Sequence, residues 1–364
     1  MSKILWISPN FNHYKARFLN HLASSDNIEM VVLAGSGRID KGDQEIHEEW
    51  KFNLIKENVS KADFGKSKQI RKQIKLLANN LDYIMIPAEK KNILLFIYLL
   101  WLRFKLKNIQ LISYNHPIIK SSNGKIRLID KILTKFYYSK LDKVVFYTEY
   151  SYFFALNNNL VNSKKAFWAN NTLDNTEIEK YYTYSPPTND YFTILFIGRL
   201  IPSKRVDILL DYFSDLKNML PNQNLRLEII GDGPQSDLIK PFNYKDIIWH
   251  GTLVSEKEIA PIMERSNLVF VPGLSGLSVN HAFMYGRVYL TLPSNNHGPE
   301  INYLKPNING IILTGNKLND LQIIKNLILD KDRIRLLSDN AKITGKKLSI
   351  QNWVEQMLKV LKNE

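Results

Sequence analysis

Two cationic side chains, Arg199 and Lys204, stand on either side of a short turn that follows an apolar run. The run at 195–198 is typical of a buried strand, and the segment "RVDILLDYF" after Lys204 has a helical pattern. Both cations therefore lie at the carboxyl end of a predicted strand and beside a predicted helix N-terminus. A guanidinium binds two oxygens at once, an ammonium adds a point charge, and helix N–H groups face the same anion. This combination suits a diphosphate, and two solvated surface charges are the alternative interpretation.

Small residues follow the next predicted strands of the C-terminal half. The motif "IIGDGP" places Gly231 and Gly233 after one apolar run, and "WHGTL" places Gly251, Thr252 and Leu253 after another. Glycine permits a positive φ angle or a close approach of the backbone to a ligand. The second loop stands where a nucleotide base could stack or bond to the backbone. An ordinary structural turn is the alternative for the first segment, and His250 in the second is more often structural than a ligand.

The stretch "VPGLSGLSVNHAFMYGR", residues 271–287, has the layout of a phosphate cradle. An apolar run breaks into small residues, and a helical rhythm follows them. The stretch has no P-loop lysine, and a lone His281 stands on the predicted helix where a carboxylate is expected. A neutral histidine donates or accepts one hydrogen bond, so His281 is a candidate ligand contact. A helix histidine satisfied within the core is the alternative.

Strand-like and helix-like segments alternate along the whole chain, which predicts two doubly wound, Rossmann-like α/β domains with parallel sheets. Predicted strands of the first domain are 3–7, 29–33, 83–87, 110–114 and 143–147, and its predicted helices are 13–24, 67–80, 92–105, 125–139 and 150–158. Predicted strands of the second domain are 193–198, 226–231, 247–251, 267–272, 288–292 and 310–313, and its predicted helices are 206–218, 256–266 and 279–286. After residue 315 the pattern is almost entirely helical.

The polar, proline-containing segment "YYTYSPPTNDY" indicates a linker between the two domains. We expect an N-terminal domain at 1–183, a hinge at 184–190 and a C-terminal domain at 191–345. The amphipathic helix at 346–364 could pack back on the N-terminal domain. Open parallel sheets bind ligands beyond the carboxyl ends of their strands, so we expect the two domains to present their loops to a shared cleft.

Composition narrows the class of protein. The chain has 364 residues, 45% of them hydrophobic and 23% charged, which fits a globular protein of two domains. It contains no cysteine, so disulfides and cysteine-ligated zinc are excluded. The first apolar run has only four residues and ends at Ser-Pro, too short for a signal peptide. We therefore expect a cytoplasmic protein.

Positive charge is concentrated in the N-terminal half. The net charge is +14, and residues 51–150 alone carry 20 basic and 7 acidic side chains. The same window contains "KKNILLFIYLLWLRFKLK", whose ten-residue apolar centre is short of the roughly 20 residues that span a bilayer. Three interpretations compete: a buried helix with solvated lysines at its ends, docking on anionic lipid, and nucleic-acid binding. No helix-turn-helix, RNP or zinc-finger pattern accompanies the charge, so we expect no nucleic-acid partner.

The motifs together resemble a known family. In order, "GRLIPSKR", "IIGDGP", "WHGTL", "VPGLSGLSVNHAFMYGR" and "NHGPEINYLKPNINGIIL" look like the C-terminal domain of GT-B glycosyltransferases of family 4, the group 1 type. This resemblance covers about 120 residues closely. The N-terminal half is similar more loosely, through "SPNFNHYKARFLNHLA", "LISYNHP", "VVFYTEYS" and "FWANNTLDN". The resemblance implies a GT-B fold and a hexosyl- or related glycosyltransferase of the EC 2.4 type.

The resemblance also implies roles for individual residues. Arg199 and Lys204 fall on the basic pair that holds the donor diphosphate, and His116 falls on the histidine that contacts the donor sugar. Implied donor-binding residues are Gly198, Gly231, Gly233, Gly251, Thr252, Leu253, Gly273, Ser275, Gly276, Leu277, His281 and Glu300. Implied acceptor-side residues are Asn10, Asn12, Tyr14 and Lys15. We expect no cofactor and no metal, because the cationic pair would take the place of a divalent ion.

The chain departs from the family pattern at two positions. The two glutamates that the family spaces eight residues apart correspond here to Gly273 and His281. We therefore expect no carboxylate nucleophile. A retaining reaction of the internal-return type needs none, because the acceptor hydroxyl attacks from the leaving-group side and the diphosphate takes its proton.

The expected partners are a UDP- or GDP-type nucleotide sugar and a glycan acceptor. The acceptor is expected to be lipid-linked or a lipopolysaccharide or polysaccharide intermediate, with the enzyme peripheral on the cytoplasmic face of the membrane. One alternative is a GT-B-fold epimerase, which the carboxylate-poor stretch 271–287 disfavours, or a phosphorylase, which needs a pyridoxal lysine and a far longer chain. Another is a degenerate, non-catalytic binding module, which Gly273 and His281 favour and Arg199, Lys204 and His116 disfavour.

Overall fold

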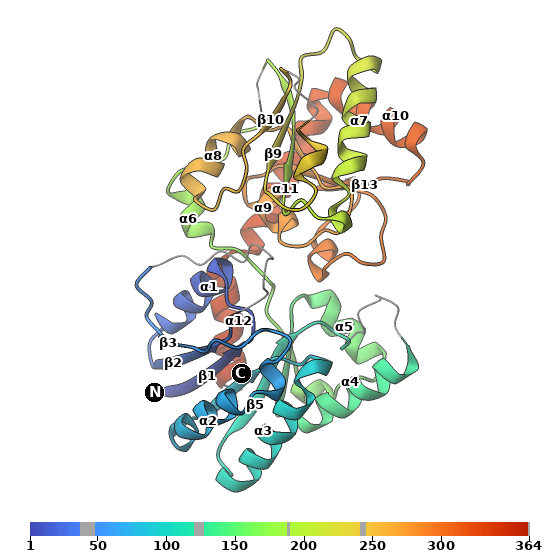
Figure 1. The fold of residues 1–364 in the computed structure, drawn as a ribbon. Helices are drawn as coiled ribbons and strands as arrows, with labels where there is room; N and C mark the ends of the chain where they lie inside the picture. The colour runs from blue at the N-terminus through green and yellow to red at the C-terminus, as the bar shows by residue number, and fades with distance from the viewer. Residues whose placement is uncertain (37–47, 120–126, 188–189, 241–244, 363–364) are drawn as a thin grey trace. The chain divides into compact units, whose positions relative to one another are not determined.

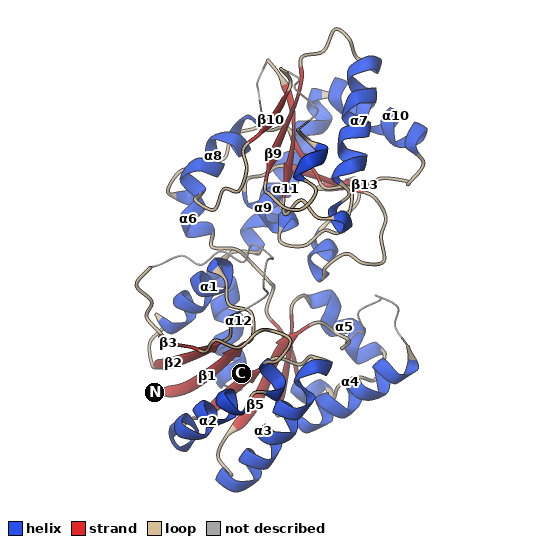
Figure 2. Ribbon diagram, in the orientation of Figure 1, coloured by secondary structure: helices blue, strands red, loops and turns tan. Residues whose placement is uncertain are grey.

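A computed structural model describes residues 1–36, 48–119, 127–187, 190–240 and 245–362. The chain divides into two compact units, which we call the N-terminal unit (Met1–Asn171 with Ile350–Glu364) and the C-terminal unit (Thr172–Ser349). Each unit contains one sheet of parallel strands with helices packed against it (Figures 1 and 2). The doubly wound α/β class predicted from the sequence is confirmed.

The N-terminal unit has a seven-stranded sheet in the order β3-β2-β1-β4-β5-β6-β7. All neighbouring pairs are parallel, with β1 and β4 adjacent at the point where the strand order reverses. The strands are β1 (Ser2–Ser8), β2 (Ile28–Ala34), β3 (Asn53–Lys56), β4 (Tyr83–Ile86), β5 (Gln110–Asn115), β6 (Lys143–Phe146) and β7 (Ala166–Trp168). The helices are α1 (His13–Ala23), α2 (Lys68–Leu77), α3 (Ile93–Leu106), α4 (Leu128–Lys140), α5 (Glu149–Asn157) and α12 (Ile350–Lys362).

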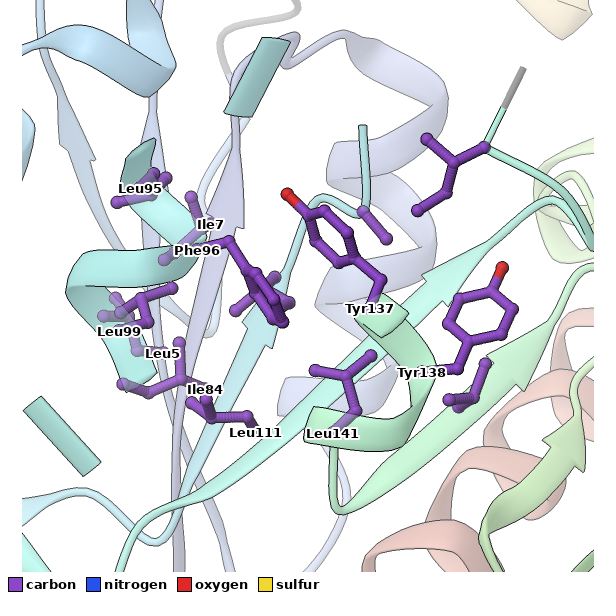
Figure 3. Close-up of a cluster of buried hydrophobic side chains, with 14 of the residues drawn as sticks. Leu5, Ile7, Ile84, Leu95, Phe96, Leu99, Leu111, Tyr137, Tyr138 and Leu141 are labelled. Carbon is purple, nitrogen blue, oxygen red and sulfur yellow. The ribbon is translucent and has the colours of Figure 1, made fainter. Parts of the chain in front are cut away.

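Alternate strand residues feed two separate cores, one on each face of this sheet. Leu5 and Ile7 pack with side chains of α2, α3 and α4, as Figure 3 shows for the labelled part of that core. Ile4 and Trp6 point to the opposite face and pack with α1 and α12. This alternation follows from the two-residue period of a strand, and burial of both faces explains why these strands are apolar throughout.

The C-terminal unit repeats the same topology with six parallel strands in the order β10-β9-β8-β11-β12-β13. The strands are β8 (Phe192–Ile197), β9 (Leu225–Ile230), β10 (Ile247–Trp249), β11 (Leu268–Phe270), β12 (Val288–Thr291) and β13 (Gly310–Ile312). The helices are α6 (Asn175–Glu179), α7 (Val206–Met219), α8 (Glu256–Arg265), α9 (Ser278–Met284), α10 (Lys317–Leu329) and α11 (Lys331–Lys347). The short 3₁₀ segments of this unit are η5 (Pro202–Lys204), η6 (Ser236–Leu238) and η7 (Pro299–Tyr303). Those of the N-terminal unit are η1 (Phe64–Lys66), η2 (Ala78–Asn80), η3 (Lys90–Asn92) and η4 (Ser163–Lys165).

The boundary between the units differs from the predicted one at residue 183. It falls between Asn171 and Thr172, because the segment that follows packs on the C-terminal unit. The Tyr182 hydroxyl donates to the Tyr285 carbonyl (3.0 Å), and the Tyr184 hydroxyl donates to Asp339 (2.6 Å). Both tyrosines stand in the polar segment 181–191, whose composition indicates a linker and gives no sign of these contacts. Residues 188–189 of that hinge, and residues 125–126 of a predicted helix, lie outside the described part of the chain.

A buried arginine completes this attachment. Arg287 has no exposed surface, and its guanidinium donates to the carbonyls of Met263 (2.7 Å), Glu264 (2.9 Å) and Ser185 (3.0 Å). The first two carbonyls close the end of α8, where the helix dipole favours a cation. A fixed positive charge therefore joins the incoming chain to the end of a core helix.

The last helix belongs to the N-terminal unit and begins at Ile350, later than the predicted start at 346. Trp353 and Met357 enter the core beside β1, and the Tyr83 hydroxyl donates to the Leu361 carbonyl (2.7 Å). Residues 346–347 instead continue α11. Among the described residues, no helix is both long enough and apolar enough to cross a membrane.

Trp353 is expected to carry much of the stability of the N-terminal unit. Its side chain is 1% exposed and packs against Phe18, with ring centroids 4.7 Å apart. Trp353→Ala should lower the free energy of unfolding of this unit by about 3–5 kcal/mol in a urea titration, because it leaves a large cavity. Trp101→Ala, at a tryptophan that is 45% exposed, is the matched control and should cost about 1 kcal/mol or less. Equal losses in the two variants would contradict the assignment of α12 to this core.

Candidate functional site

The candidate site lies in the C-terminal unit, where loops from several strands meet at one edge of the sheet. Because all six strands are parallel, the loops that follow β8, β9, β11 and β12 leave from the same edge. The Leu200 N–H donates to the Asp232 carbonyl (2.9 Å), and the Gly231 N–H donates to the Gly251 carbonyl (2.7 Å). The loops after β8, β9 and β10 are thus bonded to one another through their backbones.

Gly231 and Gly233 let the loop after β9 lie directly on the loop after β8. A Cβ added at Gly231 would stand 1.9 Å from the Gly198 carbonyl oxygen, and one at Gly233 would stand 2.6 Å from the Leu200 oxygen. Both glycines also have positive φ angles, 134° and 154°. These glycines, which the sequence nominated as donor contacts, therefore have a packing role that no other residue type fills.

Gly273 has the same role for the loop after β11. Its N–H donates to the Lys204 carbonyl (3.0 Å), and the Leu274 N–H donates to the Ser203 carbonyl (2.7 Å). A Cβ at Gly273 would lie 2.2 Å from the Ser203 oxygen. Position 273, which corresponds to a glutamate in the family pattern, therefore has no room for a side chain, because the η5 backbone occupies that space.

Lys204 is held in the middle of these loops. Its side chain is partly buried, and its Nζ donates to the Leu274 carbonyl (2.6 Å). Burial, with the nearby charge of Arg199, lowers the pKa of Lys204 to about 8, and Glu300 opposes this shift. Two cations close enough to repel each other, one of them partly desolvated, form a site whose electrostatics improve when an anion binds. The structure thus brings together Arg199, Lys204 and Glu300 from the predicted set.

Glu300 is buried at the start of η7, and its charge favours the protonated form of Lys204. A Cβ at Gly298 would lie 2.4 Å from a Glu300 carboxylate oxygen, so the backbone passes close to this side chain. The Gly298 N–H also donates to the Ser275 carbonyl (2.8 Å), which ties the loop after β12 to the loop after β11. Glu300 therefore supports the cationic pair from the interior.

His297 is a site residue that the sequence reasoning missed. Its Nδ1 accepts from the Ser275 N–H (3.0 Å), which requires the proton on Nε2, and Nε2 lies 2.9 Å from the Leu292 carbonyl. Burial, and also the charge of Lys204, lower the pKa of His297, and the Leu292 carbonyl acts in the opposite sense. A neutral histidine therefore fixes the small-residue loop at Ser275. The signal was its position in "NHGPE", three residues before Glu300, which the sequence analysis had named as a donor-binding residue.

Ser275 directs its hydroxyl into the protein. The hydroxyl donates to Thr291 Oγ1 (3.2 Å) and accepts from the Tyr289 hydroxyl (3.1 Å). Gly276 is open, since a Cβ there would meet nothing within 4 Å, and the partly exposed Leu277 is the N-cap of α9. The stretch around Gly276 therefore has backbone that is open to a ligand.

The structure places His281 in the core, away from the candidate ligand contacts. Its ring is 2% exposed, and its Nε2 lies 3.2 Å from a carboxylate oxygen of the buried Glu256 on α8. The Tyr285 hydroxyl donates to the same oxygen (2.8 Å). The expectation that His281 bonds a ligand hydroxyl fits this geometry poorly, because the ring nitrogen is used by Glu256. The satisfied core histidine is the interpretation that the contacts favour.

The loop after β10 remains accessible in part. Gly251 has a φ of 68° and nothing within 4 Å of an added Cβ, Thr252 is exposed, and Leu253 is partly buried. The neighbouring His250 bonds the buried Glu228 (2.8 Å), which Arg265 also contacts (2.6 Å). His250 Nε2 is therefore used by a buried partner, and the accessible part of this loop is at Gly251 and Thr252.

The predicted residues of the N-terminal unit lie at the carboxyl edge of its own sheet. His116 follows β5, is exposed, and packs edge-on against Tyr147 with ring centroids 5.0 Å apart. Asn12 is the N-cap of α1 and accepts from the Lys15 N–H (3.1 Å). The Lys15 Nζ donates to the carbonyl of the buried Asn10 (2.8 Å), while Tyr14 is partly exposed. Asn12 and Lys15 thus have local structural partners.

Among the described residues, no group of three or more His, Asp or Glu side chains could hold a metal ion. The chain has one Asp-x-Asp sequence, at residues 330–332. Asp330 is the N-cap of α11 and accepts from the Arg333 N–H (2.8 Å). That motif is therefore accounted for by helix capping.

Two parallel-sheet Rossmann-like domains with these loops define the GT-B fold of glycosyltransferases. Residues 191–327, within the C-terminal unit, match the model of the family described as "Glycosyl transferases group 1". Over 178 residues the chain is 28% identical to an uncharacterized glycosyltransferase of Methanocaldococcus jannaschii, a match that covers 47% of this chain and 48% of that protein. The match thus spans only about half the length of this curated relative.

Solved structures agree with this fold along the whole chain. HepE of Anabaena in complex with UDP is 13% identical with a TM-score of 0.68, over 100% of both chains. A sucrose-phosphate synthase of Thermosynechococcus elongatus is 14% identical with a TM-score of 0.71, over 100% of this chain and 99% of that one. A glycosyltransferase of Rickettsia africae is 16% identical with a TM-score of 0.70 at the same coverage.

Gly273 should be intolerant of any side chain, unlike its neighbour Gly276. Gly273→Ala should destabilise the C-terminal unit by about 1–3 kcal/mol, because the methyl group would overlap the η5 backbone. Gly276→Ala, at a position with open space, is the matched control and should be nearly neutral. Thermal unfolding measures both variants. A Gly273→Ala protein as stable as the control would show that these loops are not in close contact.

Proposed function

We propose that the protein is a group 1 glycosyltransferase of family 4 that moves a sugar from a nucleotide-diphosphate donor to a glycan acceptor. The observation that carries the proposal is the pair Arg199 and Lys204, held at the end of β8 beside Glu300. A partly desolvated ammonium next to a guanidinium has the charge that a diphosphate needs. The family match at residues 191–327 contains all three residues.

The proposed donor is a UDP- or GDP-sugar that binds the C-terminal unit. The open loops around Gly251 and Gly276 have the accessible backbone that a nucleotide requires. HepE, which has a similar fold, is described in complex with UDP, with UDP and glucose, and with UDP-glucose. These complexes support a hexosyl donor for this chain, and among the bases they favour uracil.

The proposed mechanism retains the configuration at the anomeric carbon. The acceptor hydroxyl attacks that carbon from the side of the leaving group while the bond from the carbon to the β-phosphate oxygen breaks. The proton of the hydroxyl passes to a phosphate oxygen, so atoms and charge balance without a protein nucleophile. Arg199 and Lys204 stabilise the negative charge that develops on the diphosphate. A nucleophile at Gly273 is excluded by space, which supports a mechanism that uses none.

The proposed acceptor is a lipid-linked glycan or a lipopolysaccharide or polysaccharide intermediate at the cytoplasmic face of the membrane. We propose that His116 contacts the donor sugar and that the surface near Asn10, Asn12, Tyr14 and Lys15 takes part on the acceptor side. The basic N-terminal half supports this assignment, because Lys and Arg side chains are attracted to the anionic cytoplasmic leaflet, where a lipid-linked acceptor would lie.

A non-catalytic nucleotide-sugar or glycan-binding module is the second candidate. The observation that favours it is the lack of a carboxylate at Gly273 and His281. Calorimetry and a transfer assay with UDP-sugars and GDP-sugars separate the two candidates. Binding with release of free nucleoside diphosphate in the presence of acceptor supports the transferase, and binding without any turnover supports the module.

Loss of either site cation should lower turnover sharply. We expect Arg199→Ala and Lys204→Ala each to lower kcat by more than about 10-fold, because each removes charge stabilisation of the leaving diphosphate. Arg205→Ala is the matched control, since Arg205 is exposed and pairs with Asp207 (3.0 Å). Full activity in both site variants would refute this assignment.

Nucleotide affinity should fall as pH rises above about 8. The pKa of Lys204 is lowered from 10.5 to about 8, chiefly by burial, so the free protein loses this positive charge within that range. If only the protonated form binds, affinity for UDP should drop about 15-fold between pH 8 and pH 9.5, with proton uptake on binding. Without ligand, the pH dependence of stability has the opposite direction. The free energy of unfolding should rise from pH 8 to pH 10.5, because in this range Lys204 holds its proton in the unfolded chain and has largely lost it in the folded protein.

Lys204→Met should remove the pH dependence of affinity, while Arg205→Ala should keep it. Calorimetry in two buffers of different ionisation enthalpy measures the proton uptake directly. A Lys204→Met protein with an unchanged pH profile would assign the titration to another group.

A further inference from the structure

The outward face of α3 carries a continuous stripe of large apolar side chains. Leu94, Ile97, Trp101 and Phe104 follow one another at helical spacing and are all exposed, Phe104 at 82%. The opposite side of the same helix, with Leu95, Phe96 and Leu99, fills the core in Figure 3. The helix is therefore apolar all round although only half of it is buried, which is unusual for a helix on a water-exposed surface.

A second stripe of the same kind lies on the neighbouring helix α4. Its outward residues are Leu128, Ile129, Ile132 and Phe136, of which Leu128 is 75% exposed. The inward residue Tyr137 stacks on Phe96 of α3, with ring centroids 3.8 Å apart. Arg103 of α3 donates to the Lys140 carbonyl at the end of α4 (2.9 Å). The two helices are thus neighbours on one face of the sheet (Figure 1), and we call their outward residues the α3–α4 face.

Positive charge accompanies these apolar side chains. The ammonium of Lys105 lies 4.3 Å from the ring centroid of Trp101, and that of Lys140 lies 6.0 Å from Phe136. Lys135 is also exposed on α4. Within α3 and α4, which the structure describes in full, the single acidic residue is Asp130, buried and paired with Lys90. The α3–α4 face is therefore apolar and cationic, with no negative charge of its own.

We propose that the α3–α4 face is a membrane-docking surface that inserts shallowly into a bilayer of anionic phospholipid. Aromatic and aliphatic side chains beside lysines are the composition of an interfacial helix, whose apolar face enters the region between headgroups and acyl chains. Stable attachment needs two signals, and this face supplies both apolar area and positive charge. Protein–protein interfaces are depleted in lysine, which makes a second copy of the chain a poorer occupant. The proposal does not depend on the nucleotide site.

Sedimentation of the full chain with phospholipid vesicles tests the proposal. Vesicles with about one third phosphatidylglycerol should bind the protein at low salt, and pure phosphatidylcholine vesicles should bind it much more weakly. Binding should weaken between about 0.05 M and 0.5 M NaCl, because salt screens the lysines. Trp101 emission should shift to the blue on binding, and a Trp101→Phe protein should lose that part of the shift.

Matched variants locate the contact. Phe104→Glu combined with Ile132→Glu should reduce vesicle binding at least tenfold, and Lys105→Ala combined with Lys140→Ala should reduce it about 25-fold, since each lysine near an anionic surface contributes about fivefold. The control is Leu318→Glu combined with Ile343→Glu, which changes exposed apolar residues of the C-terminal unit and should leave binding intact. Circular dichroism checks that each variant is folded.

Three outcomes would overturn the proposal. The first is no binding of the parent chain to anionic vesicles at low salt. The second is equal binding by the α3–α4 variants and the control. The third is a dimer in analytical ultracentrifugation that Phe104→Glu dissociates while vesicle binding is absent, which would make a second copy of the chain the occupant.

Discussion

Backbone-to-backbone contact without an intervening Cβ is the constraint on which the candidate site depends. Gly231 lies against the Gly198 carbonyl, and Gly273 lies against the carbonyl of Ser203. Together they bring the loops after β8, β9 and β11 closer than side chains would permit. Lys204, on the loop clamped by Gly273, consequently reaches the Leu274 carbonyl and meets the charges of Arg199 and Glu300. The position of the ammonium is thus set by residues that have no side chain.

This arrangement places an electrostatic cost on the charged form of Lys204. A lysine that is partly desolvated and faces another cation is less stable in its charged form than one in water, as its lowered pKa shows. Glu300 and the Leu274 carbonyl offset part of that cost. A bound diphosphate would offset more of it, because it places negative charge beside both cations. Because backbone hydrogen bonds join these loops, the proposed binding of a diphosphate would require little rearrangement of the loop backbone.

Much of the fold could be predicted from the sequence, because strands buried on both faces read as short apolar runs. The exceptions have physical causes. β3 and β7 are short edge strands, and β3 has two exposed residues among four. The unit boundary was misplaced because Tyr182 and Tyr184 stand in a polar segment, and only the fold reveals their partners. Arg199 and Lys204 could be proposed from the sequence because charge beside a strand end is visible locally. The burial of His281 against Glu256, 25 residues away, depends on helix packing that no local pattern records.

The return of α12 to the first unit has a consequence for the order in which the protein is assembled. The C-terminal unit is one continuous stretch, residues 172–349, so all of its core is available once that stretch has left the ribosome. The N-terminal unit is synthesised first, but the core between its sheet and α1 lacks Trp353, Met357 and Val360 until α12 has been synthesised. Domains usually fold in the order of synthesis. Here the C-terminal unit can be completed first. One apolar face of the N-terminal sheet stays only partly covered until residues 172–349 have been synthesised and α12 follows them.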